Sequence, residues 1–180
     1  HELSVCISKE TGKPLWESRM EVAAMINKIS ISIDAYQNRC PTIVTSNTNT
    51  SRVLRHYPLG IMGILGPFNF PGHLPNGHIV PALLAGNTIV FKPSEFTPLV
   101  GEMYMSLFKN IGLPDGVINY VQGGAETGKV IASHPDLNGL CFTGSYSVGK
   151  LLSGIFGESP HRLLALEMGG NNPLVVTDIK

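Results

Sequence analysis

The sequence predicts an α/β fold in which helices flank a parallel sheet, preceded by an N-terminal helix and an extended arm. Two observations support this prediction. After Pro58, short apolar segments alternate with Gly, Pro or Ser turns and with helical patterns, as in βαβ units. Glycine makes up 20 of 180 residues, which is above its usual share of about 7%. The excess lies at the ends of the predicted strands, where parallel sheets bind ligands.

The N-terminal part is predicted to contain one long helix and an arm. Apolar residues recur at three- and four-residue steps from Ser18 to Tyr36, which predicts an amphipathic helix. Residues 41–51 are rich in Thr, Ser and Asn and lack an apolar period, which predicts a loop. Residues 52–57 alternate as an exposed or edge strand would. We therefore divide the chain into an N-terminal helical part at 1–40, an arm at 41–57 and an α/β domain at 58–180.

Within the α/β domain, each expected strand is a short apolar run that ends at Gly, Pro or Ser, and each expected helix is an amphipathic segment between two such runs. The predicted strands are residues 60–66, 88–92, 117–122, 139–143, 162–167 and 173–177. The predicted helices are residues 74–85, 98–111, 125–133 and 146–156.

Composition and charge narrow the classes of function. The chain is 43% hydrophobic and 14% charged, a balance typical of an enzyme core. Its 13 basic and 13 acidic residues give no net charge, so we expect neither a nucleic-acid nor a membrane partner. The three cysteines form no Cys-x-x-Cys pair, which is typical of a reducing compartment and predicts a cytoplasmic location. The chain begins at His1, with neither Met nor a signal peptide, and we expect it to be partial.

A single carboxylate, Glu167, ends the apolar run 163–167 and is followed closely by Gly169 and Gly170. We expect this carboxylate to be buried, and burial would favour a role as a proton acceptor, because a purely structural site would usually hold an apolar residue. The residues alone do not show what it would activate, because none of the three cysteines follows it.

Two glycine-rich turns, residues 123–130 and 144–151, are near matches to a phosphate-binding loop. Each has two glycines and a lysine, but Val or Leu stands where a Ser or Thr hydroxyl should bind Mg²⁺, which disfavours a nucleotide-hydrolysing enzyme. A G-x-G-x-x-G fingerprint is also absent. The turn at Gly144-Ser145 could still offer backbone amides and a positive helix end to a pyrophosphate. Alternatively, it is only a tight turn with a serine cap.

Polar residues follow two more of the predicted strands. Lys92 and Glu95 could clasp a ribose, and the carboxylate would favour a free 2′-hydroxyl and hence NAD over NADP. The alternative is a solvated ion pair at a helix start. Asn69 lies in a proline-bounded turn, where its amide could donate to a developing oxyanion or could serve the turn alone. His73 and His78 are five residues apart, which does not suit a metal pair on a helix, so we expect no metal.

Six ordered motifs closely resemble the aldehyde dehydrogenase superfamily. They are residues 68–71, 81–88, 91–95, 112–117, 142–145 and 166–170. The resemblance implies a Rossmann-like NAD-binding domain, the start of an oligomerisation arm at 41–57, and a catalytic domain that is absent from this chain. Most members have Lys-Ser after the Gly-Gly pair, whereas this chain has Asn171-Asn172. In this feature, the chain is most similar to the branch that acts on succinylated substrates.

The resemblance also implies a role for each candidate site residue. Glu167 matches the general base that activates water, and Asn69 matches the amide of the oxyanion hole. Lys92 and Glu95 match a clasp for the adenosine ribose. The remaining positions matched to the cofactor site are Phe68, Gly124, Gly144, Ser145, Tyr146, Ser147, Val148 and Gly149.

The implied reaction is the NAD-dependent oxidation of N-succinylglutamate 5-semialdehyde, a small-molecule aldehyde, to N-succinylglutamate in arginine catabolism. A cysteine thiolate would attack the aldehyde, hydride would pass to NAD⁺, and Glu167 would help water to hydrolyse the thioester. The family's cysteine follows the general base beyond Lys180, so we expect this chain alone to be inactive and the full-length enzyme to be a homo-oligomer. The alternative is a catalytically inactive dinucleotide-binding or interaction module.

Overall fold

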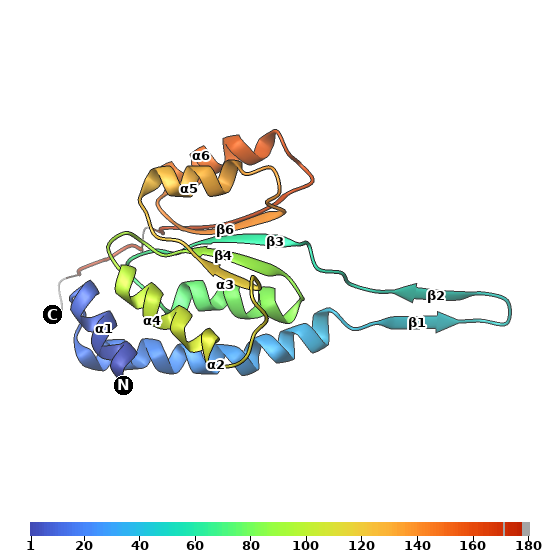
Figure 1. Ribbon diagram of the computed structural model, residues 1–180, viewed down its shortest axis with the longest axis horizontal. Helices are drawn as coiled ribbons and strands as arrows, with labels where there is room; N and C mark the ends of the chain where they lie inside the picture. Colours follow the sequence, from blue (N-terminus) through green and yellow to red (C-terminus); the bar gives the residue numbers. More distant parts are fainter. Residues whose placement is uncertain (171, 178–180) are drawn as a thin grey trace.

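The computed structural model describes residues 1–170 and 172–177. Its centre is a parallel five-stranded sheet with helices on both faces, which confirms the predicted fold class (Figure 1). The strand order is β5-β4-β3-β6-β7. The strands are β3 (Ile61–Leu65), β4 (Thr88–Lys92), β5 (Ile118–Tyr120), β6 (Gly139–Gly144) and β7 (Leu163–Met168).

The helices form two layers on one side of the sheet and a single layer on the other (Figure 1). Helices α3 and α4 pack on β3, β4 and β5, and α1 and α2 pack outside them. Helices α5 and α6 cover the opposite face. Their bounds are α1 (Glu2–Thr11), α2 (Leu15–Arg39), α3 (His73–Leu84), α4 (Pro98–Lys109), α5 (Ala125–Ser133) and α6 (Tyr146–Gly157).

The order in which the chain adds strands to the parallel sheet reverses at β3, in the middle of the sheet. From β3 the chain moves outward through β4 to the edge strand β5, then returns to the other side of β3 as β6 and continues to β7. The loops that leave β3 and β6 therefore diverge toward opposite faces. In open α/β sheets, ligands bind at the carboxyl ends of the strands at this point.

Each face of the sheet has its own apolar core, because successive side chains of a strand point to opposite sides. Ile64 of β3 belongs to the cluster under α2, α3 and α4, and the next residue, Leu65, belongs to the cluster under α5 and α6. The first cluster also contains Met25, Ile79, Ile89, Phe91, Tyr104 and Met105. The second also contains Ala132, Leu137, Leu140, Phe142, Leu152 and Phe156.

An exposed hairpin projects from the body of the molecule (Figure 1). It consists of β1 (Ile43–Ser46) and β2 (Ser51–Leu54), paired antiparallel so that Ile43 faces Leu54. The predicted extended segment at 52–57 contains β2, but the predicted loop at 41–51 is wrong in part, because it contains β1. The β-branched run from Ile43 to Thr45 favours a strand. The turn is closed by Asn47, whose Oδ1 accepts from the Thr50 amide at 2.9 Å.

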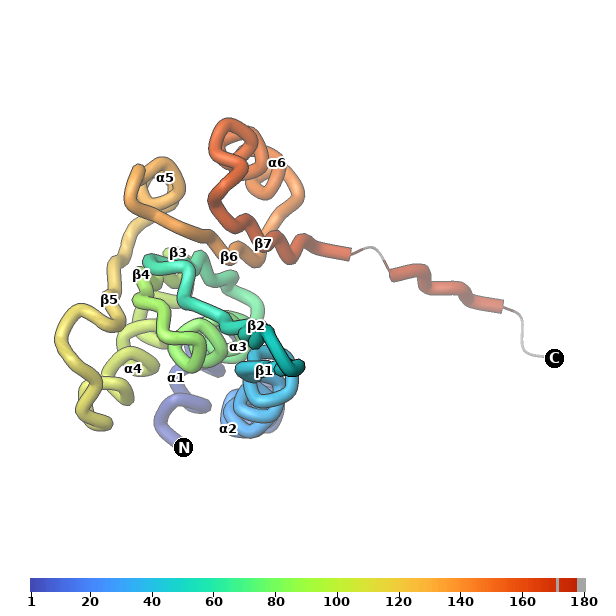
Figure 2. The backbone as a smooth tube through the Cα atoms, turned by 90° about the vertical axis from the view of Figure 1, so that its right-hand side faces the viewer, coloured from blue at the N-terminus to red at the C-terminus, as the bar shows by residue number. Residues whose placement is uncertain are grey.

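Most predicted elements are confirmed, with two corrections. The strands and helices expected within residues 60–168 agree with the structure to within two residues at each end. The N-terminal part holds two helices, which separate where Gly12 adopts a left-handed conformation (φ 76°) before Pro14. The strand predicted at 173–177 is wrong, because residues 172–177 form no strand. They lead away from the body (Figure 2), and a strand forms only where a neighbouring strand pairs with it.

Candidate active site

A cleft of about 590 Å³ lies at the carboxyl ends of β3, β6 and β7. This is the point in the parallel sheet where the order of the strands along the chain reverses. Backbone and side chains from three loops or turns line it: the turn after β3, the loop after β4 and the β6–α6 turn. The end of β7 completes the wall. Six of the predicted site residues are brought together here, namely Phe68, Asn69, Gly144, Ser145, Val148 and Glu167.

Glu167 is the next-to-last residue of β7, where it is the register partner of Thr143 on β6. Its side chain faces the cleft but is exposed, so the expectation of a buried carboxylate is wrong. The physical reason is its position: among the described strands, β7 lies at the edge of the sheet and has a neighbour on one side only. The carboxylate therefore stands where water can reach it.

Asn69 lies in the turn that leads from β3 to α3. Its Oδ1 accepts a hydrogen bond from the Phe70 amide at 3.1 Å. This bond orients the carboxamide and uses its oxygen, so the Nδ2 hydrogens remain as donors. The neighbouring Phe68 packs edge-to-face on Phe96, with ring centroids 6.1 Å apart, and both rings line the cleft.

The β6–α6 turn has the features of an anion site. Ser145 caps α6 by accepting from the Val148 amide at 3.4 Å, and the first turn of this helix contains no acidic residue. A Cβ atom at Gly144 would lie 2.5 Å from the Phe142 ring, so the close turn requires glycine. Thr143 also lines the cleft, and its hydroxyl is buried without a hydrogen-bond partner among the described residues. An unpaired buried hydroxyl is costly, which suits a ligand-facing position.

Lys92 is the last residue of β4, and Glu95 lies on the loop that follows. Neither lines the cleft, although Ser94 and Phe96 of this loop do. The Lys92 side chain is only 8% exposed; its Nζ donates to the Pro93 carbonyl at 2.9 Å and lies 3.8 Å from Glu95 Oε2. Burial lowers the pKa of Lys92, and Glu95 partly opposes this effect. The pair is thus a half-buried ion pair beside the cleft, with the carboxylate facing solvent.

The other predicted cofactor residues lie outside the cleft. Gly124 is the N-cap of α5, and a side chain there would meet nothing within 4 Å. Tyr146 and Ser147 are exposed on the first turn of α6. A Cβ atom at Gly149 would collide with the sulfur of Met168, so this glycine lets α6 approach β7. The structure gives Gly149 a packing role rather than a place at the cleft.

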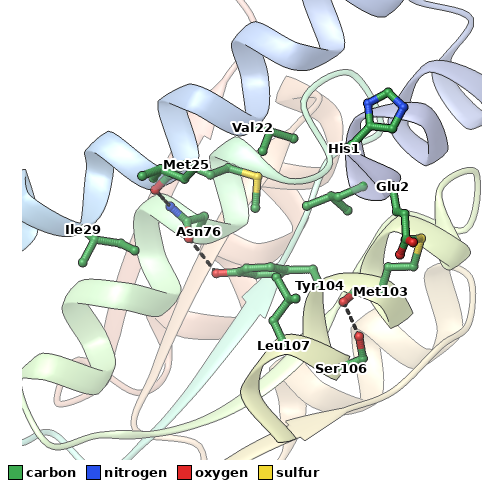
Figure 3. Close-up of a pocket in the computed structure, with 12 residues that line it drawn as sticks. His1, Glu2, Val22, Met25, Ile29, Asn76, Met103, Tyr104, Ser106 and Leu107 are labelled. Atoms are coloured by element: carbon green, nitrogen blue, oxygen red, sulfur yellow. Dashed lines mark hydrogen bonds between the residues drawn. The ribbon is translucent and has the colours of Figure 1, made fainter. Parts of the chain in front are cut away.

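A second cavity, of about 530 Å³, lies between α1, α2, α3 and α4 (Figure 3). Its buried polar groups satisfy one another, since Tyr104 Oη donates to Asn76 Oδ1 at 2.8 Å and Asn76 Nδ2 donates to the Met25 carbonyl at 3.1 Å. Burial raises the pKa of Tyr104, which keeps the phenol protonated and able to donate. We interpret this chain of bonds as a structural link between α2, α3 and α4.

The sequence profile described as the aldehyde dehydrogenase family matches residues 1–179. The chain belongs to this family. N-succinylglutamate 5-semialdehyde dehydrogenases from the O395 and M66-2 strains of Vibrio cholerae serotype O1 are each 56% identical to it over 177 residues. Each comparison covers 98% of this chain and 36% of the relative, so the chain spans about a third of the length of these curated relatives. The expected similarity to the succinylated-substrate branch is confirmed.

Solved aldehyde dehydrogenase structures share this fold. An NAD-dependent aldehyde dehydrogenase from Sinorhizobium meliloti has a TM-score of 0.88 and 32% sequence identity, covering 96% of this chain and 34% of that one. The glyceraldehyde-3-phosphate dehydrogenase GapN from Methanocaldococcus jannaschii, complexed with NADP, has a TM-score of 0.84 and 33% identity, covering 96% and 38%.

Sequence reasoning missed some cleft residues of this aldehyde dehydrogenase chain. Thr143 and Phe96 line the cleft but were not predicted as site residues. Their positions directly before and after the predicted turns were the available signal.

No group of three or more His, Cys, Asp or Glu residues in the described ranges is placed to hold a metal ion. Across the same ranges, no helix has the length and apolarity to cross a membrane.

Proposed function

We propose that this chain is the NAD-binding part of an enzyme that oxidises N-succinylglutamate 5-semialdehyde to N-succinylglutamate in arginine catabolism, with NAD as the cofactor. The observation that carries this proposal is the cleft at the reversal point of the sheet, which brings an amide donor, Asn69, and a carboxylate, Glu167, to the N-terminus of α6. The 56% identity to the Vibrio cholerae enzymes supports the succinylated substrate.

The residues of the cleft suit a dinucleotide. The backbone amides at the start of α6 and the glycine turn before it fit a pyrophosphate, and Thr143 lies beside them on the wall of the cleft. The Glu95 carboxylate, exposed beside the cleft, fits a ribose with a free 2′-hydroxyl and would repel a 2′-phosphate. Bound NAD⁺ would supply the hydride acceptor.

The chain's own residues supply charge stabilisation and base catalysis. Asn69 would donate from Nδ2 to the oxygen of the aldehyde as it gains negative charge during thiolate addition. Glu167 would take a proton from a water molecule that attacks the resulting thioester, and its exposed position gives that water access. Both groups line one cleft, so they can act on the same carbon atom in succession.

The attacking thiolate is proposed to come from a cysteine beyond Lys180. Cys141 is unsuited to the role, because it lies within β6, packs against the core and has a pKa that burial raises to about 11. Burial also raises the pKa of Cys6, which lies on α1 and is absent from the residues that line the cleft. All three cysteines are free, which supports the proposed cytoplasmic location.

The β1–β2 arm supports a proposed homo-oligomer. Its strands expose Ile43, Val44, Val53 and Leu54, which is unfavourable for a projecting hairpin in water. Contact with a second copy of the chain would bury these side chains.

The proposal is tested by NADH formation from N-succinylglutamate 5-semialdehyde and NAD⁺. The 180-residue chain should form no NADH, whereas the protein extended through the expected cysteine should turn over. Calorimetry should show that both forms bind NAD⁺. Turnover by the short form would contradict the position assigned to the nucleophile, and an extended form that binds NAD⁺ without turnover would instead favour an inactive binding module.

A further inference from the structure

We propose that two glutamates of the N-terminal helices, Glu21 and Glu10, are separate positioning residues for the two sides of the site. Glu21 fixes the turn that carries Asn69, and Glu10 fixes the loop that carries Glu95, the ion-pair partner of Lys92. This inference rests on the proposed function, because it assigns the two loops to chemistry and to cofactor binding.

Helices α3 and α4 begin directly after these two loops, and neither has a side-chain cap of its own. The N-cap residues, Gly72 and Thr97, make no capping bond. By contrast, α6 is capped locally by Ser145. A helix start needs acceptors for its first amides, and for α3 and α4 those acceptors come from residues far earlier in the chain.

Glu21 provides the acceptors for α3. Its side chain, on α2, is 0% exposed, and its Oε1 accepts from the amides of Gly72 and His73 at 2.9 and 3.1 Å. Its other oxygen accepts from Lys13 Nζ at 2.8 Å. The buried carboxylate is therefore satisfied on both sides, by a cation and by the positive end of a helix.

The Lys13–Glu21 ion pair also contacts Phe70, the residue next to Asn69. Lys13 Nζ lies 3.5 Å from the centroid of the Phe70 ring, and a Cβ atom at Gly72 would lie 2.7 Å from the sulfur of Met25. The turn therefore packs closely against α2 at Gly72, and the Phe70 ring of the same turn contacts the Lys13 ammonium. Because the Phe70 amide donates to Asn69 Oδ1, the orientation of the Asn69 carboxamide depends on where this backbone lies.

Glu10 provides the acceptors for α4. Its Oε1 and Oε2 accept from the amides of Leu99 and Val100 at 3.1 and 2.8 Å. The loop that this helix start anchors follows Lys92, the last residue of β4, and contains Glu95 and the cleft residue Phe96. The two glutamates therefore act on different loops, although both belong to the outer layer of helices, α1 and α2.

The experiment compares Glu21→Ala and Glu10→Ala in the protein extended through the cysteine. Misplacing a reacting group by about 1 Å can cost about a hundredfold in rate, so Glu21→Ala should lower kcat by roughly tenfold to a hundredfold while the Kd for NAD⁺ stays within about twofold. Glu10→Ala should raise that Kd by roughly tenfold, the effect of about 1.4 kcal/mol, and leave kcat at saturating NAD⁺ nearly unchanged. The matched control is Glu126→Ala, which removes an exposed first-turn glutamate of α5 and should change neither.

Amide hydrogen exchange gives a readout that does not need turnover. Glu21→Gln, which keeps an oxygen for the α3 amides but loses the charge paired with Lys13, should speed exchange at residues 70–74 and not at 99–101. Glu10→Gln should do the reverse. Equal changes in both loops, or normal kcat and Kd in both alanine variants, would overturn the proposal. A wild-type enzyme that does not oxidise the aldehyde would contradict the proposed function. The exchange measurement would still decide the positioning roles of Glu21 and Glu10.

Discussion

Thr143 and Glu167 are register partners on adjacent parallel strands, and both line the same cleft. The pair places a buried hydroxyl that lacks a partner among the described residues beside a carboxylate that faces water. One strand end thus suits a bound ligand and the next suits proton transfer from solvent.

Glu167→Gln in the extended protein should separate the two halves of the reaction. Loss of a general base costs typically about 10²- to 10⁴-fold, so steady-state turnover should fall by that order. The first NADH formed per site should still appear as a rapid burst, because thioester formation precedes the step assigned to Glu167. Stopped-flow absorbance measures both phases, and loss of the burst would place Glu167 in an earlier step.

Asn69→Ala should slow thioester formation itself. Removal of one oxyanion donor typically lowers kcat by about 10²- to 10³-fold, and the burst rate should fall by that order. The Kd for NAD⁺ should stay close to its wild-type value. Asn110→Ala, at the exposed C-cap of α4, is the control for loss of an asparagine. A burst rate that does not change would limit Asn69 to a role in the turn.

Glu95→Gln should relax the preference for NAD⁺ over NADP⁺. The substitution removes the negative charge that would repel a 2′-phosphate but keeps a hydrogen-bonding side chain. We expect the ratio of the two Kd values, measured by calorimetry, to shift toward NADP⁺ by roughly tenfold, equivalent to about 1.4 kcal/mol. An unchanged ratio would leave the Lys92–Glu95 pair as a surface ion pair.

His78 should make the stability of the chain fall in mild acid. Burial lowers the pKa of His78 below its usual 6.5, Glu167 partly opposes this shift, and Lys28 adds to it. Its Nε2 is buried without a partner among the described residues. The unfolded state therefore takes up a proton before the folded state does, so the stability is complete above pH 6.5 and is lost as the pH falls through the lowered value.

The measurement is urea unfolding of the chain and of His78→Gln at a series of pH values. The variant should lose part of the acid sensitivity between pH 6.5 and the lowered pKa, since glutamine does not titrate. His134→Gln, on the exposed C-cap of α5, is the control and should follow the wild-type curve. Parallel curves for wild type and His78→Gln would assign the acid sensitivity to other groups.

Much of the fold could be predicted from local pattern. The buried strands β3, β4 and β6 are short apolar runs bounded by glycine or polar turns, and that pattern has few alternatives. The same logic failed at residues 173–177, where Leu174, Val175 and Val176 resemble a buried strand but are exposed. A strand depends on a neighbour to complete its hydrogen bonds, and the pattern of a single segment does not reveal that neighbour.

The site could be predicted less completely, because its geometry depends on contacts distant in sequence. Asn69 and Glu167 stood out as polar residues at strand ends, and the structure brings them to one cleft. The exposure of Glu167 follows from the edge position of β7, which no local pattern indicates. Glu21 was simply one residue of an amphipathic helix in the sequence, yet it accepts from amides 51 and 52 positions later.

The place of β7 at the edge of the sheet affects how the chain will behave in solution. Within the described residues this strand pairs only with β6, so its outer row of N–H and C=O groups offers a template for another strand. Leu163 and Met168, at its two ends, are also exposed. Such an edge promotes strand addition between molecules and aggregation. Self-association of the purified chain should therefore increase with its concentration and decrease when another segment covers this edge.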